Sequence, residues 1–220
     1  IENEWDSISE RNNHVKAFKT DGSKVTFYST NMKLICLYSS HINGDILIGV
    51  TEGRCSFPFR KGGTGKVIRC DSTGKKLQEI ELKDQDQTER LYEYPQFITE
   101  NRINGDILVS DVGRDALVVV DKSGRHRFNY RGDLPSERLF DPRSVCTDVR
   151  GSILIIHQHY DSYRSETCIS LLDQDGSIIT RFRKGDLHFE SCTALCVDGE
   201  NNMYVGWGSR IEVFKLSDSP

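Results

Sequence analysis

Two histidines separated by one residue form the most suggestive metal-binding pair in the sequence. His157 and His159 are followed closely by Asp161. Alternate residues of a strand share a face, and imidazole and carboxylate groups are ordinary zinc ligands. No third ligand is fixed by the spacing, so we interpret the pair as partly exposed side chains at a strand end. Cys192 and Cys196 likewise flank one predicted strand, and we expect no metal site.

A glycine run, Gly62-Gly63-Thr64-Gly65-Lys66, resembles the start of a phosphate-binding P-loop. That motif requires a glycine five residues before the glycine of its Gly-Lys pair and a Ser or Thr after the lysine. Arg60 and Val67 stand at those positions, and a strand pattern follows where the motif needs a helix. The run is therefore interpreted as a loop, and we expect no small-molecule cofactor.

Carboxylates recur at equivalent places along the chain, namely Glu100, Asp148 and Asp198. A catalytic centre needs different groups whose pKa values are set apart, whereas a residue repeated in each unit more simply accepts hydrogen bonds from the following turn. We therefore expect no catalytic residues in this chain.

Arginine and tyrosine gather in three segments that we place between predicted second and third strands. These residue types dominate protein interfaces because they bury a large area and keep a polar group. The predicted binding residues are Arg114, Tyr160, Tyr163, Arg164 and Arg210. A basic segment of the type that RNA-binding surfaces use is interpreted instead as a turn and a solvated outer strand; it comprises Lys122, Arg125, His126, Arg127, Phe128, Tyr130 and Arg131.

The elements that carry these residues repeat along the chain. Turn glycines stand at Gly22, Gly74, Gly124 and Gly176, which are 52, 50 and 52 residues apart. Each turn follows a β-rich run such as 116–120, and a second such run beginning with a Gly-Asp or similar turn lies upstream, as at 105–109. Four short strands in about fifty residues, without helical periodicity, indicate the blades of a β-propeller.

The expected fold is all-β, with four-stranded antiparallel blades in one domain over residues 1–220. Five blades are recognisable, of which the first and last are incomplete: 4–30, 34–82, 96–131, 144–183 and 194–216. These ranges supply about eighteen strands, whereas a closed five-bladed ring needs twenty and a six-bladed ring twenty-four. The chain is therefore either a compact five-bladed ring, with residues 1–5 near the C-terminal blade, or a fragment of a six-bladed ring.

Composition narrows the class of partner. The net charge is −4 and the pI about 5.9, so the chain has no general attraction for nucleic-acid phosphates. Seven cysteines, an odd number, stand mostly in apolar runs, which favours reduced thiols and a cytoplasmic protein. No apolar run approaches the length of a membrane helix, and we expect no membrane contact.

The stretches 104–111 and 118–125 resemble NHL repeats of tripartite-motif (TRIM) proteins, especially the divergent copies of bivalve molluscs. The resemblance implies an NHL-type propeller whose parent protein carries RING, B-box and coiled-coil modules and acts as a ubiquitin ligase. The aspartate that such repeats carry in their second strand is present at Asp111, whereas Val50, His157 and Trp207 stand at the matching positions.

The resemblance and the loop residues together predict a non-catalytic module that binds a protein on its loop face. In a TRIM-like ligase this module is the substrate-binding end. Two alternatives remain open: binding of RNA stem-loops by the same face, and a metal-dependent propeller enzyme.

Overall fold

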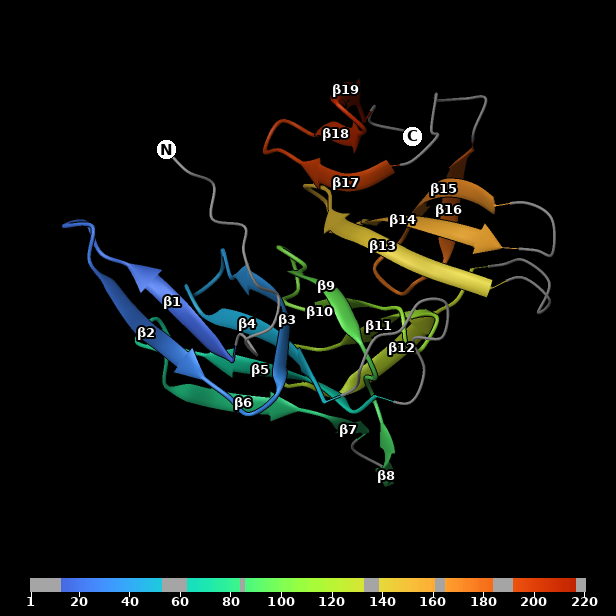
Figure 1. Cartoon of the computed structure of the whole chain (residues 1–220). Helices are drawn as coiled ribbons and strands as arrows, with labels where there is room; N and C mark the ends of the chain where they lie inside the picture. Colours follow the sequence, from blue (N-terminus) through green and yellow to red (C-terminus); the bar gives the residue numbers. More distant parts are fainter. Residues whose placement is uncertain are drawn as a thin grey trace.

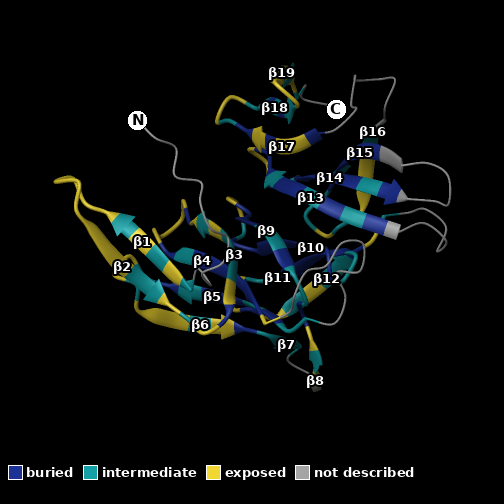
Figure 2. Cartoon of the chain, viewed as in Figure 1, coloured by how far each residue is buried: buried dark blue, intermediate teal, exposed yellow. Residues whose placement is uncertain are grey.

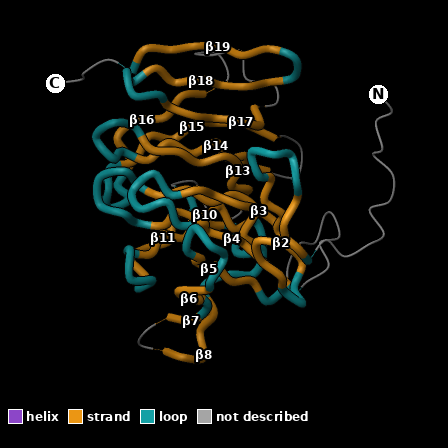
Figure 3. Tube along the Cα trace, turned by 90° about the vertical axis from the view of Figure 1, so that its left-hand side faces the viewer, coloured by secondary structure: helices purple, strands orange, loops and turns teal. Residues whose placement is uncertain are grey.

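Every regular element in the described part of the computed structural model is a β-strand, as Figures 1 and 3 show. The structure describes residues 13–52, 63–83, 86–132, 139–160, 165–183 and 192–216. Across these ranges there is no helix of the length and apolarity that a membrane crossing requires.

Three four-stranded antiparallel sheets form the centre of the molecule, and each follows chain order from its inner to its outer strand. We call them blades A, B and C. Their strands are, for blade A, β3 (Lys33–Ser39), β4 (Ile46–Thr51), β5 (Gly65–Cys70) and β6 (Lys76–Ile80); for blade B, β9 (Pro95–Glu100), β10 (Ile107–Asp111), β11 (Ala116–Val120) and β12 (His126–Tyr130); and for blade C, β13 (Leu139–Thr147), β14 (Ile153–Tyr160), β15 (Ser165–Leu172) and β16 (Ile178–Arg183).

Smaller sheets complete the described structure. Blade D has three strands, β17 (Cys192–Val197), β18 (Asn202–Trp207) and β19 (Arg210–Lys215). Strands β1 (His14–Phe18) and β2 (Lys24–Ser29) form a hairpin at the other end. A short hairpin of β7 (Leu82–Lys83) and β8 (Asp86–Arg90) follows blade A, where we had expected the outer strand to continue to residue 82.

The repeated turns between third and fourth strands have the geometry that their residue types favour. In blade C, one oxygen of Asp173 accepts hydrogen bonds from the backbone N–H groups of Asp175 (2.9 Å) and Ser177 (2.8 Å). Gly176 has a φ angle of +86°, a backbone conformation that residues other than glycine rarely adopt. The turn therefore forms from local interactions alone.

Apolar residues pack between neighbouring blades. Leu117 and Val119 of blade B face Ile153 and Ile155 of blade C, and all four are at most 1% exposed. Figure 2 shows this buried centre and the more exposed residues of β1 and β2. Hydrogen bonds cross the same boundary, since the Asn101 side-chain amide donates to the Gly151 carbonyl at 2.8 Å.

The expected all-β class with four-stranded antiparallel blades is confirmed. Closure of the ring is not seen in the described residues. The hairpin β1–β2 packs on blade A through Val15 and Phe27, whereas blade D packs on blade C, so the two lie at opposite ends of the row (Figure 1). Residues 1–5, which were expected near the C-terminal blade of a five-bladed ring, lie outside the described residues.

Candidate functional site

The turns between second and third strands share one end of the blades, because the four strands of each blade alternate in direction. We call this end the loop face. Among the described residues it carries the turn 112–115 of blade B and the turn 208–209 of blade D, together with the chain that leads into each inner strand.

Asp111 organises the blade B turn from within. Its buried carboxylate accepts hydrogen bonds from four backbone N–H groups, those of Glu93 (2.8 Å), Tyr94 (2.9 Å), Gly113 (2.9 Å) and Arg114 (3.0 Å). Burial raises the pKa of this carboxyl to about 6, although the four N–H groups act in the opposite direction. The aspartate thereby ties the turn to the chain entering β9.

Arg114 stands on this turn with its side chain 21% exposed. Its guanidinium nitrogens lie 3.6 Å from a carboxylate oxygen of Glu89 and 3.6 Å from one of Glu93. Arg131 donates a hydrogen bond to the Arg114 carbonyl at 2.5 Å. The positive charge of Arg114 is therefore matched by two carboxylates of the same blade boundary.

Arg210 occupies a different environment on blade D. It is exposed, and its guanidinium carbon lies 5.7 Å from the centre of the Trp207 ring, a cation–π geometry. Arg114 and Arg210 are separated by blade C, so the structure does not bring them together. Tyr160 ends β14, but its side chain, Tyr163 and Arg164 lie outside the described residues.

The histidine pair is buried, which corrects the expectation of partly exposed side chains. His157 is 0% and His159 2% exposed, because Phe140 and Tyr130 pack against them. The His157 Nε2 atom is hydrogen-bonded to the Ser170 hydroxyl at 2.7 Å. Burial, assisted by His159, lowers the pKa of His157 to about 3, so this imidazole is neutral at physiological pH.

No group of three His, Cys, Asp or Glu side chains is arranged around a common metal position in the described ranges. The Cys192 and Cys196 side chains do not converge: the first is buried against blade C, whereas the second is exposed.

Two of the recurring carboxylates accept hydrogen bonds from the turns that follow them, as the sequence predicted. Asp148 accepts from the N–H groups of Arg150 and Ser152, at 2.9 and 2.7 Å. Asp198 accepts from Asn202, whose side-chain amide and backbone N–H are the main reasons that the Asp198 pKa falls to about 2. Glu100 differs, because it accepts from the Ser40 hydroxyl and from Arg69 of blade A.

Two arginines of the basic segment are paired with carboxylates. Arg125 pairs with Asp121 at 2.8 Å. Arg127 pairs with Asp106 of its own blade and with Asp175 of blade C, the latter at 2.5 Å. These residues lie on the turn and the outer strand β12, as expected. Arg127 thereby links blades B and C.

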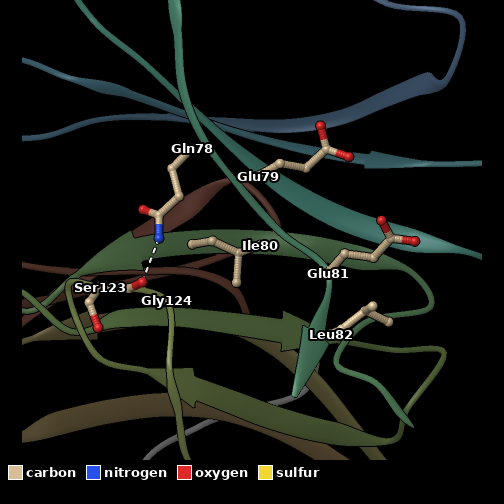
Figure 4. A pocket seen from close by; sticks show the side chains of 7 residues that line it. All are labelled: Gln78, Glu79, Ile80, Glu81, Leu82, Ser123 and Gly124. Carbon is tan, nitrogen blue, oxygen red and sulfur yellow. Dashed lines mark hydrogen bonds between the residues drawn. The ribbon is translucent and has the colours of Figure 1, made fainter. Parts of the chain in front are cut away.

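A pocket of about 330 Å³ on the outer side of blades A and B was not foreseen from the sequence. Figure 4 shows Gln78, whose side-chain amide donates to the Ser123 carbonyl at 2.5 Å, beside the apolar side chains of Ile80 and Leu82. Glu79 also lines it, but that carboxylate is paired with Lys66 and Lys76. The pocket joins residues more than 40 positions apart, so no local pattern marks it.

Comparisons with known proteins identify the fold. No protein-family model and no curated protein matches the sequence. Among solved structures, the chain is similar to an X-ray structure of a candidate gluconolactonase, with a TM-score of 0.54 and 15% identity over 90% of this chain and 66% of that one. It also matches the extracellular domain of a hybrid two-component system protein from B. thetaiotaomicron, with a TM-score of 0.47 and 15% identity over 92% of this chain and 31% of that one. The chain thus spans less than two thirds of either structure, and the first likeness supports a propeller-type fold.

Proposed function

We propose that this chain is a non-catalytic recognition module that binds a protein partner through its loop face. The observation that carries the proposal is the set of contacts that two arginines make on the loop face. Arg114 lies between two carboxylates, and Arg210 is stacked on Trp207. A surface of charge pairs and arginine–aromatic stacks suits a partner that presents both signs of charge and apolar groups.

RNA stem-loops are less well matched by these contacts. A phosphate backbone is bound by rows of cations that release counterions, and such binding weakens steeply with salt. Arg125 and Arg127 are paired with aspartates instead, and the chain carries a net charge of −4. The described cations therefore favour protein over RNA.

The test is a comparison of captured proteins between the native chain and Arg210→Glu. Proteins that depend on the loop face should be retained at least about tenfold less by Arg210→Glu, because an exposed interface arginine is replaced by the opposite charge. Lys122→Glu is the matched control, since Lys122 is an exposed cation on a turn at the other end of blade B. Melting temperatures should agree among the three proteins.

Two outcomes contradict the proposal. Equal retention of all proteins by the native chain and Arg210→Glu would remove the loop face as the binding surface. Loss of binding after ribonuclease treatment, with an affinity that falls steeply as salt rises, would show RNA to be the ligand.

The finer proposal is that the module is the substrate-binding end of a TRIM-like ubiquitin ligase in the cytoplasm. It rests on the resemblance of residues 104–111 and 118–125 to NHL repeats. It predicts that a captured partner becomes ubiquitinated by the full-length protein in a reconstituted reaction, and that Arg210→Glu reduces this modification in proportion to binding.

A further inference from the structure

Strand β19 is a third strand without a fourth in the described part of the chain. In blades A, B and C the third strands β5, β11 and β15 pair with a neighbour on both sides. In blade D, β19 pairs with β18 on one side only, and no further strand of the described residues pairs with its outer edge. Strand β19 belongs to the last sheet in the row of described sheets, of which the hairpin β1–β2 is the first (Figure 1). A free strand edge of this kind pairs readily with another strand.

Ile211 marks the centre of this edge. It pairs with Gly206 of β18, and the same position in blades A, B and C is held by Val67, Leu117 and Ile169. Those three side chains are 0% exposed, whereas Ile211 is 73% exposed. Val67, Leu117 and Ile169 each have a fourth strand beside them and also pack in an apolar cluster with the following blade, whereas Ile211 has neither neighbour among the described residues.

The complete blades show what kind of residue covers this position. The fourth strand places Ile80 opposite Val67, Tyr130 opposite Leu117 and Phe182 opposite Ile169. Each is a large apolar or aromatic residue. A strand that adds to β19 is therefore expected to bring a large apolar side chain opposite Ile211.

Charges on either side of Ile211 add a second requirement. Arg210 and Glu212 flank it, and within the described residues neither has an ion-pair partner. Residues directly opposite in an antiparallel pair point to the same side of the sheet, and opposite charges there are stabilising. The added strand should thus carry a carboxylate opposite Arg210 and a cation opposite Glu212.

Strand β19 itself meets all three requirements. When two copies run antiparallel about a twofold axis at Ile211, Ile211 faces the same residue of the second copy, and Arg210 faces Glu212 twice. Such an interface uses one patch on both copies, as twofold dimers do. Alternative registers are worse: an axis at Val213 places Lys215 opposite Ile211, and an axis at Glu212 places two carboxylates opposite each other.

We propose that two copies of this chain associate through the outer edges of their β19 strands, forming one continuous six-stranded sheet from two blades D. This interaction surface is separate from the proposed partner-binding function of the loop face, although Arg210 belongs to both. The short overlap makes the association weak and dependent on concentration.

Sedimentation velocity over a wide concentration range tests the proposal on the complete chain. The native chain should pass from monomer to dimer as concentration rises. Arg210→Glu alone and Glu212→Arg alone should each weaken dimerisation at least about tenfold, because both attractive pairs become repulsive. The double variant Arg210→Glu/Glu212→Arg should restore it, since the pairs are reversed but still complementary.

Mixing the two single variants gives a sharper readout. In a mixed dimer, a β19 strand with two acidic residues faces one with two basic residues, so mixed dimers should form at concentrations where each variant alone is monomeric. Ile179→Arg, which changes a 56% exposed apolar residue on β16, is the matched control and should dimerise normally.

The results that would contradict the β19 dimer differ from those that would contradict partner binding by the loop face. A native chain that stays monomeric at all concentrations, or a double variant that is no better than the single variants, contradicts the β19 dimer. A monomeric chain whose β19 amides exchange as slowly as those of β11 would show that another segment of the same chain covers the edge. Glu212→Arg should keep partner binding by the loop face, so dimerisation and partner binding are scored separately.

Discussion

Asp111 and His157 occupy equivalent second-strand positions in consecutive blades, but they make different contacts and have different structural roles. Asp111 accepts four backbone hydrogen bonds and holds the Arg114 turn. His157 bonds the Ser170 hydroxyl and packs against Phe140, with ring centres 4.9 Å apart. One organises a loop on the candidate binding face, whereas the other fills the core between blades B and C.

The buried histidine should make stability depend on pH. The His157 pKa is lowered to about 3 in the folded chain, against roughly 6.5 for an exposed histidine. Between these values the unfolded chain binds a proton that the folded chain does not. The stability is therefore present above about pH 6.5 and is lost as pH falls toward 3, by at most about 1.4 kcal/mol per pH unit from this group.

Urea unfolding at several pH values measures this effect as the difference between the native chain and His157→Gln. The comparison is needed because Asp111 works in the opposite direction: its pKa is raised to about 6, so its contribution to stability grows as pH falls below 6. His159, whose ring contacts that of His157, and Arg181, which donates a hydrogen bond to the Ser170 hydroxyl, remain in both proteins. Parallel pH profiles for the two proteins would contradict the assignment to His157.

At the scale of elements, the repeated turn also fixes how neighbouring blades meet. A side chain at Gly176 would put its Cβ 2.4 Å from the Phe128 ring of blade B, whereas at the equivalent Gly22 no atom lies within 4 Å. Both glycines have positive φ, of 86° and 82°. Glycine is therefore required at position 176 both by the positive φ angle and by the close approach of blade B, whereas at position 22 it is required by the φ angle alone.

This pair of glycines permits a matched measurement. Gly22→Ala should lower the free energy of unfolding by about 1 kcal/mol through backbone strain alone. Gly176→Ala should cost about 1–3 kcal/mol more, because the added methyl group must displace a packed aromatic ring. Chemical denaturation of the two variants decides the point, and equal losses would mean that the ring moves aside without cost.

For the whole molecule, the described blades form an open row in which the middle blades are covered on both faces. Blade B packs against blade A through one apolar cluster and against blade C through another. The hairpin β1–β2 and blade D each pack on one neighbour. Stability in such an array comes from contacts between adjacent units.

Amide hydrogen exchange should be slower in the middle blades, which pack on two neighbours, than in the end sheets, which pack on one. Amides of β1, β2 and β19 are expected to exchange at least about tenfold faster than those of β10, β11 and β14, because the end sheets open without disturbing two interfaces. Mass spectrometry at a protein concentration where the chain is monomeric measures the order. Uniform protection from end to end would indicate that the ring is closed in solution.

Much of this architecture can be predicted from interactions between residues close together in the sequence. The aspartate and glycine of each third-to-fourth strand turn bond within five residues, and the flanking apolar runs alternate as paired strands do, so the all-β class and the repeated unit follow from short-range chemistry. The position of Arg114 on the turn between second and third strands follows for the same reason, whereas Arg210, predicted in the equivalent loop, is the first residue of β19.

Tertiary structure alone decided what those residues contact. His157 and His159 are buried because Tyr130 arrives from the preceding blade, and Arg114 meets Glu89 and Glu93 across a blade boundary. The exposure of Ile211 depends equally on which strands stand beside β19. Burial, ion pairing and pKa are properties of neighbours brought together from distant positions, and periodicity along the chain does not specify which neighbours meet.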